Sequence, residues 1–331
     1  MPWLSPAAKT ESRLHMLFLL CWLSSFRDSH FCNWASLAAI PAQESDARAS
    51  KSGTMERLAD LHIHTTASDG AMTPTQIVRM AADAGLAAIG ITDHDTVDGV
   101  DEAVAAGQDL GVIVVPGVEI SAIYGHNIEV HMLGYFFDHN APALRSQLDT
   151  LRNARTIRGK KMVERLNEAG VAISFERVTE IAQGGAIGRP HVARALLEMG
   201  VVSTIDAAFG KYLQEGGPGY VPRYKISPSD AVTLIVQAGG VACCAHVAKL
   251  NRDELLIDLM RQGMRAIEVR HPDHGSAGTR YYERFAAKHD LIPTGGSDAH
   301  CIQGGKTTTV GGVTVSYGIV ERLKAASTCS V

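Results

Sequence analysis

The segment Asp60-Leu-His-Ile-His64 places two imidazoles two residues apart within an apolar run. Side chains two apart in a β-strand point to the same side, so His62 and His64 would face one way while the intervening residues pack the other way. Imidazole nitrogens are common ligands of divalent metal ions. The segment therefore predicts a pair of histidines that bind one metal ion, and Asp69, shortly after it in the sequence, is a further candidate ligand.

Further histidines and carboxylates, which are also possible metal ligands, lie within or just after five other strand-length apolar runs. They are His94, Glu119, His131, His246, Asp298 and His300. If these runs are strands of a (β/α) barrel, their carboxyl ends converge on one face, where the active sites of such barrels lie. Residues scattered from one end of the barrel sequence to the other would then meet in one pocket.

Six histidines, two aspartates and one glutamate make nine candidate donors without a thiolate, a mixture that suits Zn, Mn or Fe ions. One ion cannot coordinate nine donors, so we expect two or three metal ions. Adjacent ions need a bridging carboxylate, for which Glu119 and Asp298 are the natural candidates. Such a centre activates a bridging water and clamps a phosphoester, which agrees with the absence of a Gly-x-Ser-x-Gly motif.

The elements that must position these residues alternate between strand and helix patterns from residue 56 onward. The expected strands are Leu58–Ile63, Ala87–Thr92, Val112–Val115, Ile128–Phe137, Val241–His246, Ala266–Val269 and Leu291–Thr294. The expected helices between them are Pro74–Ala84, Val97–Leu110, Pro228–Ala238, Arg252–Arg261 and Gly278–His289. This alternation predicts an α/β fold with a parallel, closed or nearly closed barrel of the (β/α)7 type.

The alternation stops over residues 139–227, where helical patterns dominate. The expected helices are Ala141–Glu168, Phe175–Ile181, His191–Met199 and Ser203–Leu213. We therefore predict a first barrel part over 56–138, a helical insert over 139–227 that caps the site, and a second barrel part over 228–331.

Residues 1–55 do not share the barrel pattern. We interpret them as a poorly ordered or spurious extension, with Met55 as a possible natural start; the alternative is a signal peptide within residues 1–42. The apolar run Met16–Phe26 is too short to span a bilayer. Six cysteines without a Cys-x-x-Cys pair favour a reducing compartment, so a cytoplasmic location is expected unless the signal peptide is genuine.

Four segments together resemble the PHP (polymerase and histidinol phosphatase) family of metal-dependent phosphoesterases. They are Ala59-Asp-Leu-His-Ile-His-Thr-Thr-Ala-Ser-Asp-Gly70, Gly90-Ile-Thr-Asp-His-Asp-Thr96, Gly117-Val-Glu-Ile-Ser121 and Gly296-Ser-Asp-Ala-His300. The resemblance implies a distorted PHP barrel with a trinuclear metal cluster, manganese being favoured over zinc or iron. The implied ligands are His62, His64, Asp69, His94, Glu119, His131, His246, Asp298 and His300.

Within that family, Gly188-Arg-Pro-His-Val-Ala-Arg194 is similar to a segment of the nucleoside 3',5'-bisphosphate phosphatase and RNase AM branch. The resemblance implies that Arg189 and His191 bind the non-reacting phosphate of a bisphosphate, and we expect Arg223 to be a third donor. The alternative for Arg189 is an ordinary surface ion pair. We also expect Asp60, Asp93 and Asp95 to orient ligand histidines. His271 is expected to be a polar surface residue or a residue that supports a ligand, and the alternative is a residue at the border of the pocket.

The expected activity is release of the 3'-phosphate from nucleoside 3',5'-bisphosphates. A 5'-3' exonuclease acting on short 5'-phosphorylated RNA or DNA is the alternative, and a non-catalytic PHP structural module or an amide hydrolase is a remote one. A formal net charge of -4 excludes a broad basic surface for duplex nucleic acid. No membrane partner is expected.

Overall fold

The structure is a computed structural model that describes residues 56–224, 226–301 and 309–329. Every described residue lies in the second of two units of the chain, Thr54–Val331. The predictions made for residues 1–55 therefore lie outside the described residues.

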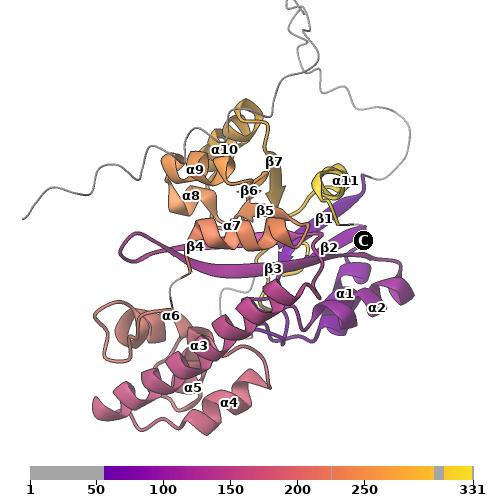
Figure 1. Ribbon diagram of the computed structural model, residues 1–331. Helices are drawn as coiled ribbons and strands as arrows, with labels where there is room; N and C mark the ends of the chain where they lie inside the picture. Colours follow the sequence, from indigo (N-terminus) through magenta and orange to yellow (C-terminus); the bar gives the residue numbers. More distant parts are fainter. Residues whose placement is uncertain (1–55, 225, 302–308, 330–331) are drawn as a thin grey trace, which may run out of the picture. The chain divides into compact units, whose positions relative to one another are not determined.

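One curved sheet forms the centre of the second unit (Figure 1). Its strands are β1 Leu58–Ile63, β2 Ala88–Ile91, β3 Ile113–Tyr124, β4 Ile128–Tyr135, β5 Val241–Cys244, β6 Ala266–Arg270, β7 Ile292–Gly295 and β8 Val315–Ser316. They are hydrogen-bonded in the order β7-β6-β5-β4-β3-β2-β1-β8. Seven strands match the seven that the sequence predicts, and β8 is a short addition beside β1.

The sheet bends until its two ends meet. Ala299, just after β7, forms a bridge with Ile63 of β1, and the backbone N–H of His64 donates to the Ala299 carbonyl across 3.0 Å. This contact closes one rim of the sheet into a barrel. The predicted α/β fold with a distorted, nearly closed barrel is confirmed.

Strand β4 departs from the predicted parallel arrangement. It runs antiparallel to both β3 and β5, whereas β1–β2, β2–β3, β5–β6 and β6–β7 are parallel. Only three residues separate Tyr124 from Ile128. That is enough for a hairpin, while a parallel crossover needs about a dozen residues or more. The prediction of a fully parallel barrel was wrong at this strand for that reason.

Helices cover the outside of the barrel. They are α1 Pro74–Asp83, α2 Val100–Leu110, α7 Pro228–Gln237, α8 Val247–Leu250, α9 Asp253–Arg261, α10 Ser276–Lys288 and α11 Tyr317–Ala326. Their ends follow local capping rules: Thr73 and Gln76 form a capping box on α1, and Gly111 ends α2 in the left-handed region. The sequence patterns did not predict α8 or α11.

The helical segment consists of α3 Pro142–Glu168, α4 Phe175–Ala182, α5 Arg189–Glu198, α6 Ile205–Ala208 and a π-helix, η1, at Phe209–Leu213. The first half of α3 packs Leu144, Leu148 and Leu151 into the barrel core. Its second half packs Met162 and Leu166 into a separate apolar core with the other helices of the segment. One long helix thus joins the barrel to a helical lobe.

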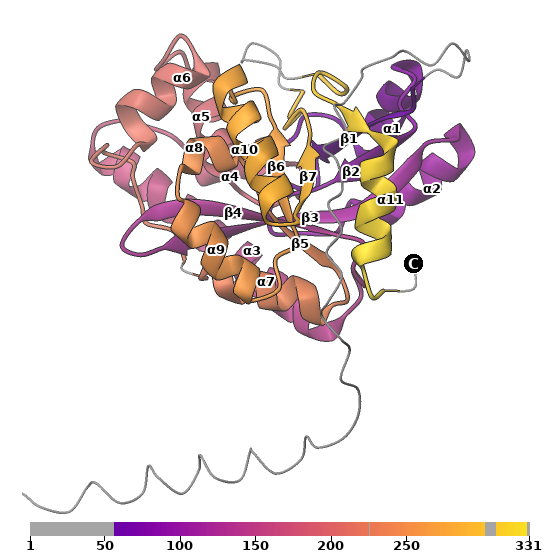
Figure 2. The same cartoon turned by 90° about the horizontal axis from the view of Figure 1, so that it is seen from above.

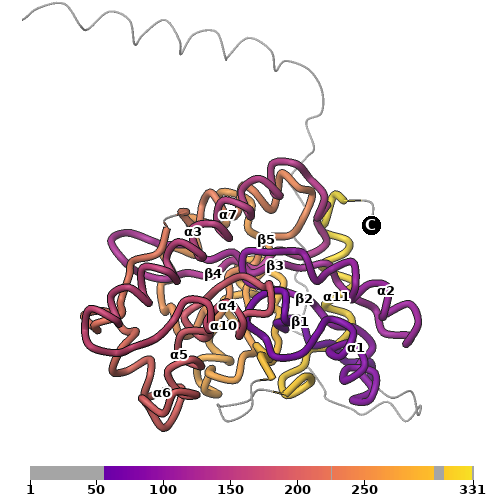
Figure 3. Tube along the Cα trace, turned by 90° about the horizontal axis from the view of Figure 1, so that it is seen from below, coloured from indigo at the N-terminus to yellow at the C-terminus, as the bar shows by residue number. Residues whose placement is uncertain are grey.

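Figures 2 and 3 both place α5 and α6 on one side of the sheet and α1, α2 and α11 on the other. No helix in the described part of the chain is long and apolar enough to cross a bilayer.

Candidate metal centre

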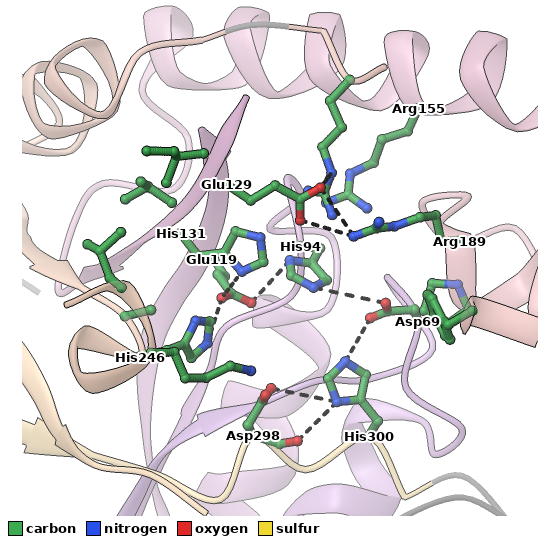
Figure 4. Close-up of a pocket in the computed structure, with 18 of the residues that line it drawn as sticks. Asp69, His94, Glu119, Glu129, His131, Arg155, Arg189, His246, Asp298 and His300 are labelled. Atoms are coloured by element: carbon green, nitrogen blue, oxygen red, sulfur yellow. Dashed lines mark hydrogen bonds and ion pairs between the residues drawn. The ribbon is translucent and has the colours of Figure 1, made fainter. Parts of the chain in front are cut away.

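The nine predicted ligands gather at the closed rim of the barrel. Figure 4 shows all of them except His62 and His64, which it does not label. His62 and His64 come from β1 and the residue after it, Glu119 from β3 and His131 from β4. His94 and His246 follow β2 and β5, whereas Asp298 and His300 follow β7. Because β4 is reversed, His131 lies in its first half yet reaches the same rim, opposite Ser121 of β3. All nine belong to overlapping groups whose donor atoms lie within 4.8 Å of one another.

Glu119 is at the centre of these groups. Its Oε2 lies 3.3 Å from His62 Nε2, 3.2 Å from His64 Nε2 and 3.1 Å from His94 Nδ1. Its Oε1 lies 2.7 Å from His131 Nδ1 and 3.3 Å from His246 Nε2. Each oxygen faces a different set of imidazoles, which is the arrangement that a carboxylate bridging two ions requires.

Two aspartates extend the cluster on either side of His64 and His300. Asp298 Oδ1 lies 3.2 Å from His64 Nε2 and 3.6 Å from His300 Nδ1, and its Oδ2 lies 3.3 Å from His271 Nε2. Asp69 Oδ1 lies 3.3 Å from His300 Nε2. The donors thus divide into more than one set, enough for two or three ions.

The hydrogen bonds of the imidazoles show which nitrogens are available as ligands. Nδ1 of His62 lies 2.9 Å from Glu268 Oε1, and Nδ1 of His300 lies 3.0 Å from the Asp298 carbonyl. Since those partners can only accept, each Nδ1 carries the proton and each Nε2 keeps its lone pair for the cluster.

Several buried imidazole nitrogens have no hydrogen-bond partner among the described residues. They are Nε2 of His62, His131 and His246, Nδ1 of His94, and both nitrogens of His64. Leaving so many buried polar atoms unsatisfied is costly. Divalent ions would satisfy them together with the three carboxylates, so the residues present fit a multinuclear metal site.

The pKa shifts reflect this concentration of charge. Burial alone would raise the pKa of Glu119, but the histidines around it, His94 and His131 foremost, hold it well below its usual range. Burial would lower the pKa of His64, yet Asp298 and Glu119 outweigh it and raise that pKa to about 10. Burial dominates at His246 and lowers its pKa to about 3. The carboxylates are therefore ionised and ready to bind cations.

The backbone is constrained where it presents these residues. His246 and Asp298 both adopt left-handed conformations, with φ of 46° and 50°. Such conformations are unfavourable for residues with a Cβ and concentrate at functional sites. Beside them, a Cβ on Gly296 would stand 2.3 Å from the backbone nitrogen of His62, so only glycine lets the segment after β7 approach β1 this closely.

Glu268 and His271 contribute contacts that the sequence analysis did not assign. Glu268 of β6 is fully buried, and its Oε2 accepts the backbone N–H of His246 across 2.9 Å. Nδ1 of His271 accepts the backbone N–H of Asp273, so in its neutral form its Nε2–H points to Asp298. His271 is therefore a buried partner of Asp298 rather than a border residue.

The three other aspartates contact backbone and hydroxyl groups. Asp60 accepts from Ser297 and from the backbone of His62 and Gly311, and Asp93 accepts from Thr65 and Ser68. Asp95 accepts from Arg155 and from the backbone of Ser121. They hold the backbone of the loops that carry the proposed ligands. Asp60 accepts the backbone N–H of His62, and Asp93 accepts that of Thr65 beside His64, so these aspartates position ligand histidines through the backbone.

A pocket of about 550 Å³ joins the cluster to the helical lobe. It is lined by Asp69, His94, Glu119, His131, His246, Asp298 and His300 together with the cations Arg155, Arg189, Arg223, Lys249 and Arg252. The sequence analysis singled out Arg189 and Arg223 among these cations. Arg155 and Arg252 lie within helical patterns and Lys249 follows a strand, where a basic residue gives no signal of a pocket.

His191 does not line this pocket. It lies at the third position of α5, is 3% exposed, and its Nδ1 accepts the backbone N–H of Gly188 across 3.0 Å. Its ring closes the first turn of α5 and places Arg189, and its contact with a phosphate stays a prediction.

The barrel and the cluster together define a class of proteins, the (β/α)-barrel metalloproteins with a rim of histidines and carboxylates. Residues 60–211 match the PHP domain family. A 3',5'-nucleoside bisphosphate phosphatase of Chromobacterium violaceum is 36% identical over 247 residues, which are 73% of this chain and 86% of that protein. The chain therefore belongs to the PHP family.

Two further comparisons agree with this membership. The 5'-3' exoribonuclease Rnm of Salmonella typhimurium is 34% identical over 248 residues, 73% of this chain and 84% of that protein. A solved structure from Bifidobacterium adolescentis, provisionally described as a metal-dependent phosphoesterase, superposes with a TM-score of 0.76 at 33% identity. It covers 81% of this chain and 96% of its own.

Proposed function

We propose that this protein is a metal-dependent phosphoesterase that removes the 3'-phosphate of nucleoside 3',5'-bisphosphates, such as adenosine 3',5'-bisphosphate, and leaves the 5'-monophosphate. The observation that carries this proposal is the single pocket that joins the histidine–carboxylate cluster to arginines of the lobe. One end suits a reacting phosphate between metal ions, and the other suits a second phosphate. The names of the two curated relatives support nucleotide substrates.

Two or three divalent ions, manganese foremost, would be held by the nine ligands, with Glu119 and Asp298 as bridges. When bound, they supply a hydroxide at neutral pH and neutralise the reacting phosphate. The protein's own residues do the rest. Glu119 and Asp298 both face Nε2 of His62 and of His64. Glu268 and His271 fix the orientation of His62 and Asp298.

Arg189 and Arg223 bind the non-reacting 5'-phosphate in this proposal, with Arg155 behind them. Arg155 already donates to Asp95 and to Ser121 Oγ, so it is fixed in place rather than free to follow a ligand. Two guanidinium groups at one end of the pocket match a phosphate dianion well.

The second candidate is a 5'-3' exonuclease on short 5'-phosphorylated RNA or DNA. Lys249 and Arg252 favour it, because they add cations to the same pocket from α8 and the residues after it. A longer strand would present further phosphates to them. The non-catalytic alternative is not supported, because all nine ligand positions are retained and converge.

Product analysis separates the candidates. Metal-loaded protein is given adenosine 3',5'-bisphosphate or a 5'-phosphorylated tetranucleotide, and phosphate and nucleotides are quantified. Phosphate and AMP from the bisphosphate with an intact tetranucleotide support the phosphatase. Stepwise release of 5'-mononucleotides from the tetranucleotide supports the exonuclease, and no turnover of either substrate contradicts both.

The cellular location is a separate proposal. We place the protein in the cytoplasm, which the free cysteines Cys243, Cys244, Cys301 and Cys329 support, since secreted proteins commonly pair their cysteines.

A further inference from the structure

Glu129 occupies the arginine end of the pocket. Its Oε2 lies 3.0 Å from Arg189 Nη2 (Figure 4). Its Oε1 lies 3.3 Å from Arg223 Nε. It stands two residues before His131 on β4, so both side chains leave the strand on the side of the pocket. A carboxylate thus lies where the proposed function places a phosphate.

The neighbouring charges show that Glu129 is the counter-ion of these two arginines in particular. Arg155 has its own carboxylate partner in Asp95. Arg158 donates from Nε to the Val221 carbonyl, and burial together with Arg223 and Arg189 lowers its pKa to about 9. The guanidinium groups therefore crowd one another, and Glu129 relieves that crowding at Arg189 and Arg223.

The pairing of Glu129 with Arg223 leaves donor capacity unused. Nε of Arg223 is buried, yet its contact with Glu129 is too poorly aligned for a hydrogen bond, and this atom has no other hydrogen-bond partner in the described part of the chain. Arg189 uses one nitrogen, Nη2, for both oxygens of Glu129. A ligand anion with more oxygens than a carboxylate could use these donors better.

We propose that Glu129 is an internal counter-ion that takes the place of the non-reacting phosphate while the pocket is empty and lowers the affinity for that phosphate. This inference rests on the proposed function. A phosphate that approaches Arg189 and Arg223 must displace Glu129 or lie beside it, and either event costs binding energy. The same carboxylate promotes release of a 5'-monophosphate product, because the product keeps the 5'-phosphate.

A purely structural role makes the opposite prediction. If Glu129 only holds the arginines in position, or accepts a hydrogen bond from the ribose, its replacement weakens nucleotide binding. The sign of the change in affinity therefore decides between the two roles.

The test is equilibrium binding of AMP and of adenosine to the full chain by titration calorimetry, with manganese and with chelator. Glu129→Gln keeps the shape of the side chain and removes its charge. We expect the variant to bind AMP about fivefold more tightly, which is the order of effect of one partly exposed charge. Its affinity for adenosine should not change. Glu129→Ala removes the side chain and should also tighten AMP binding.

Asp98→Asn is the matched control. Asp98 is likewise held by two arginines, Arg145 and Arg152, but does not line the pocket, so AMP binding should not change. Equal or weaker AMP binding by both Glu129 variants overturns the inference.

Phosphate release from adenosine 3',5'-bisphosphate is measured on the same preparations. Tighter AMP binding without turnover by the unmodified chain means that the proposed function fails while Glu129 keeps the inferred role. Turnover with unchanged AMP affinity means that only the inference fails.

Discussion

Glu268 accepts a hydrogen bond from Nδ1 of His62 across 2.9 Å, and neither side chain is exposed to solvent. The other oxygen of the same carboxylate accepts the backbone N–H of His246. One buried glutamate therefore fixes the ring of one proposed ligand and the backbone of a second. It also selects the His62 tautomer whose Nε2 faces Glu119.

Replacing Glu268 with glutamine should weaken metal binding. An amide has one acceptor oxygen where the carboxylate has two, so it cannot hold both partners and cannot reinforce the basicity of His62. We expect metal affinity to fall about 10- to 100-fold, measured by competition with a chromophoric chelator. Glu283→Gln is the control, because the Glu283 side chain is partly exposed and pairs with Arg270. An unchanged affinity in Glu268→Gln would show that the hydrogen bond is incidental.

Asp298→Asn should abolish turnover while the protein stays folded. The amide removes the charge that faces His62, His64 and His300, and it is a poor bridge between ions. We expect phosphate release to fall at least about 100-fold, with the circular dichroism spectrum unchanged. Asp258→Asn, an exposed residue that pairs with Arg261, should keep full activity. Activity within a few-fold of the unmodified protein would remove Asp298 from the proposed site.

Chelation of metal should lower the melting temperature. The cluster leaves buried imidazole nitrogens without hydrogen bonds and brings three carboxylates together, so ions that bind only the folded state stabilise it. At a free metal concentration of 100 times the dissociation constant, the free energy of unfolding rises by about 2.7 kcal/mol, which raises the melting temperature by about 5 °C for a folded unit of this size. Differential scanning fluorimetry with EDTA and then manganese measures it. Glu119→Gln should lose most of this shift, and an equal shift in that variant would place the stabilising ion elsewhere.

The convergence of the proposed ligands could be predicted because parallel strands end on one rim. In addition, histidines and aspartates, which are common metal ligands, follow β1, β2, β5 and β7. His131 reached the same rim for a different reason. Its strand is reversed, and the three-residue turn before Ile128 contained the signal for that reversal. The length of the connection between β3 and β4 therefore predicts the direction of β4, which the alternation of strands and helices does not.

The supporting residues could not be predicted in the same way. Glu268 lies in the strand Ala266–Arg270, where a single glutamate among apolar residues looks like a solvent-facing position. Only the curvature of the sheet turns it toward His62. The motif around His191 predicted a ligand contact but gave no sign of the buried ring that accepts the Gly188 N–H and caps α5.

His191 should make the protein sensitive to acid between about pH 6.5 and pH 4. Burial, reinforced by Arg194 and Arg155, lowers its pKa to about 4, although Asp69 opposes the shift. The unfolded chain binds the proton near pH 6.5. Between these values the unfolded state holds more protons than the folded state, so the free energy of unfolding falls as the pH is lowered. The full loss is at most about 3 kcal/mol.

His191→Gln should flatten this part of the stability curve. Glutamine at the third helical position can still accept the Gly188 N–H, so capping of α5 is kept while the titrating ring is removed. Urea unfolding with chelator present, at pH 7.5, 6, 5 and 4, measures the difference between variant and unmodified protein. Parallel curves for His191→Gln and the unmodified protein would show that this buried imidazole is not the source of the acid sensitivity.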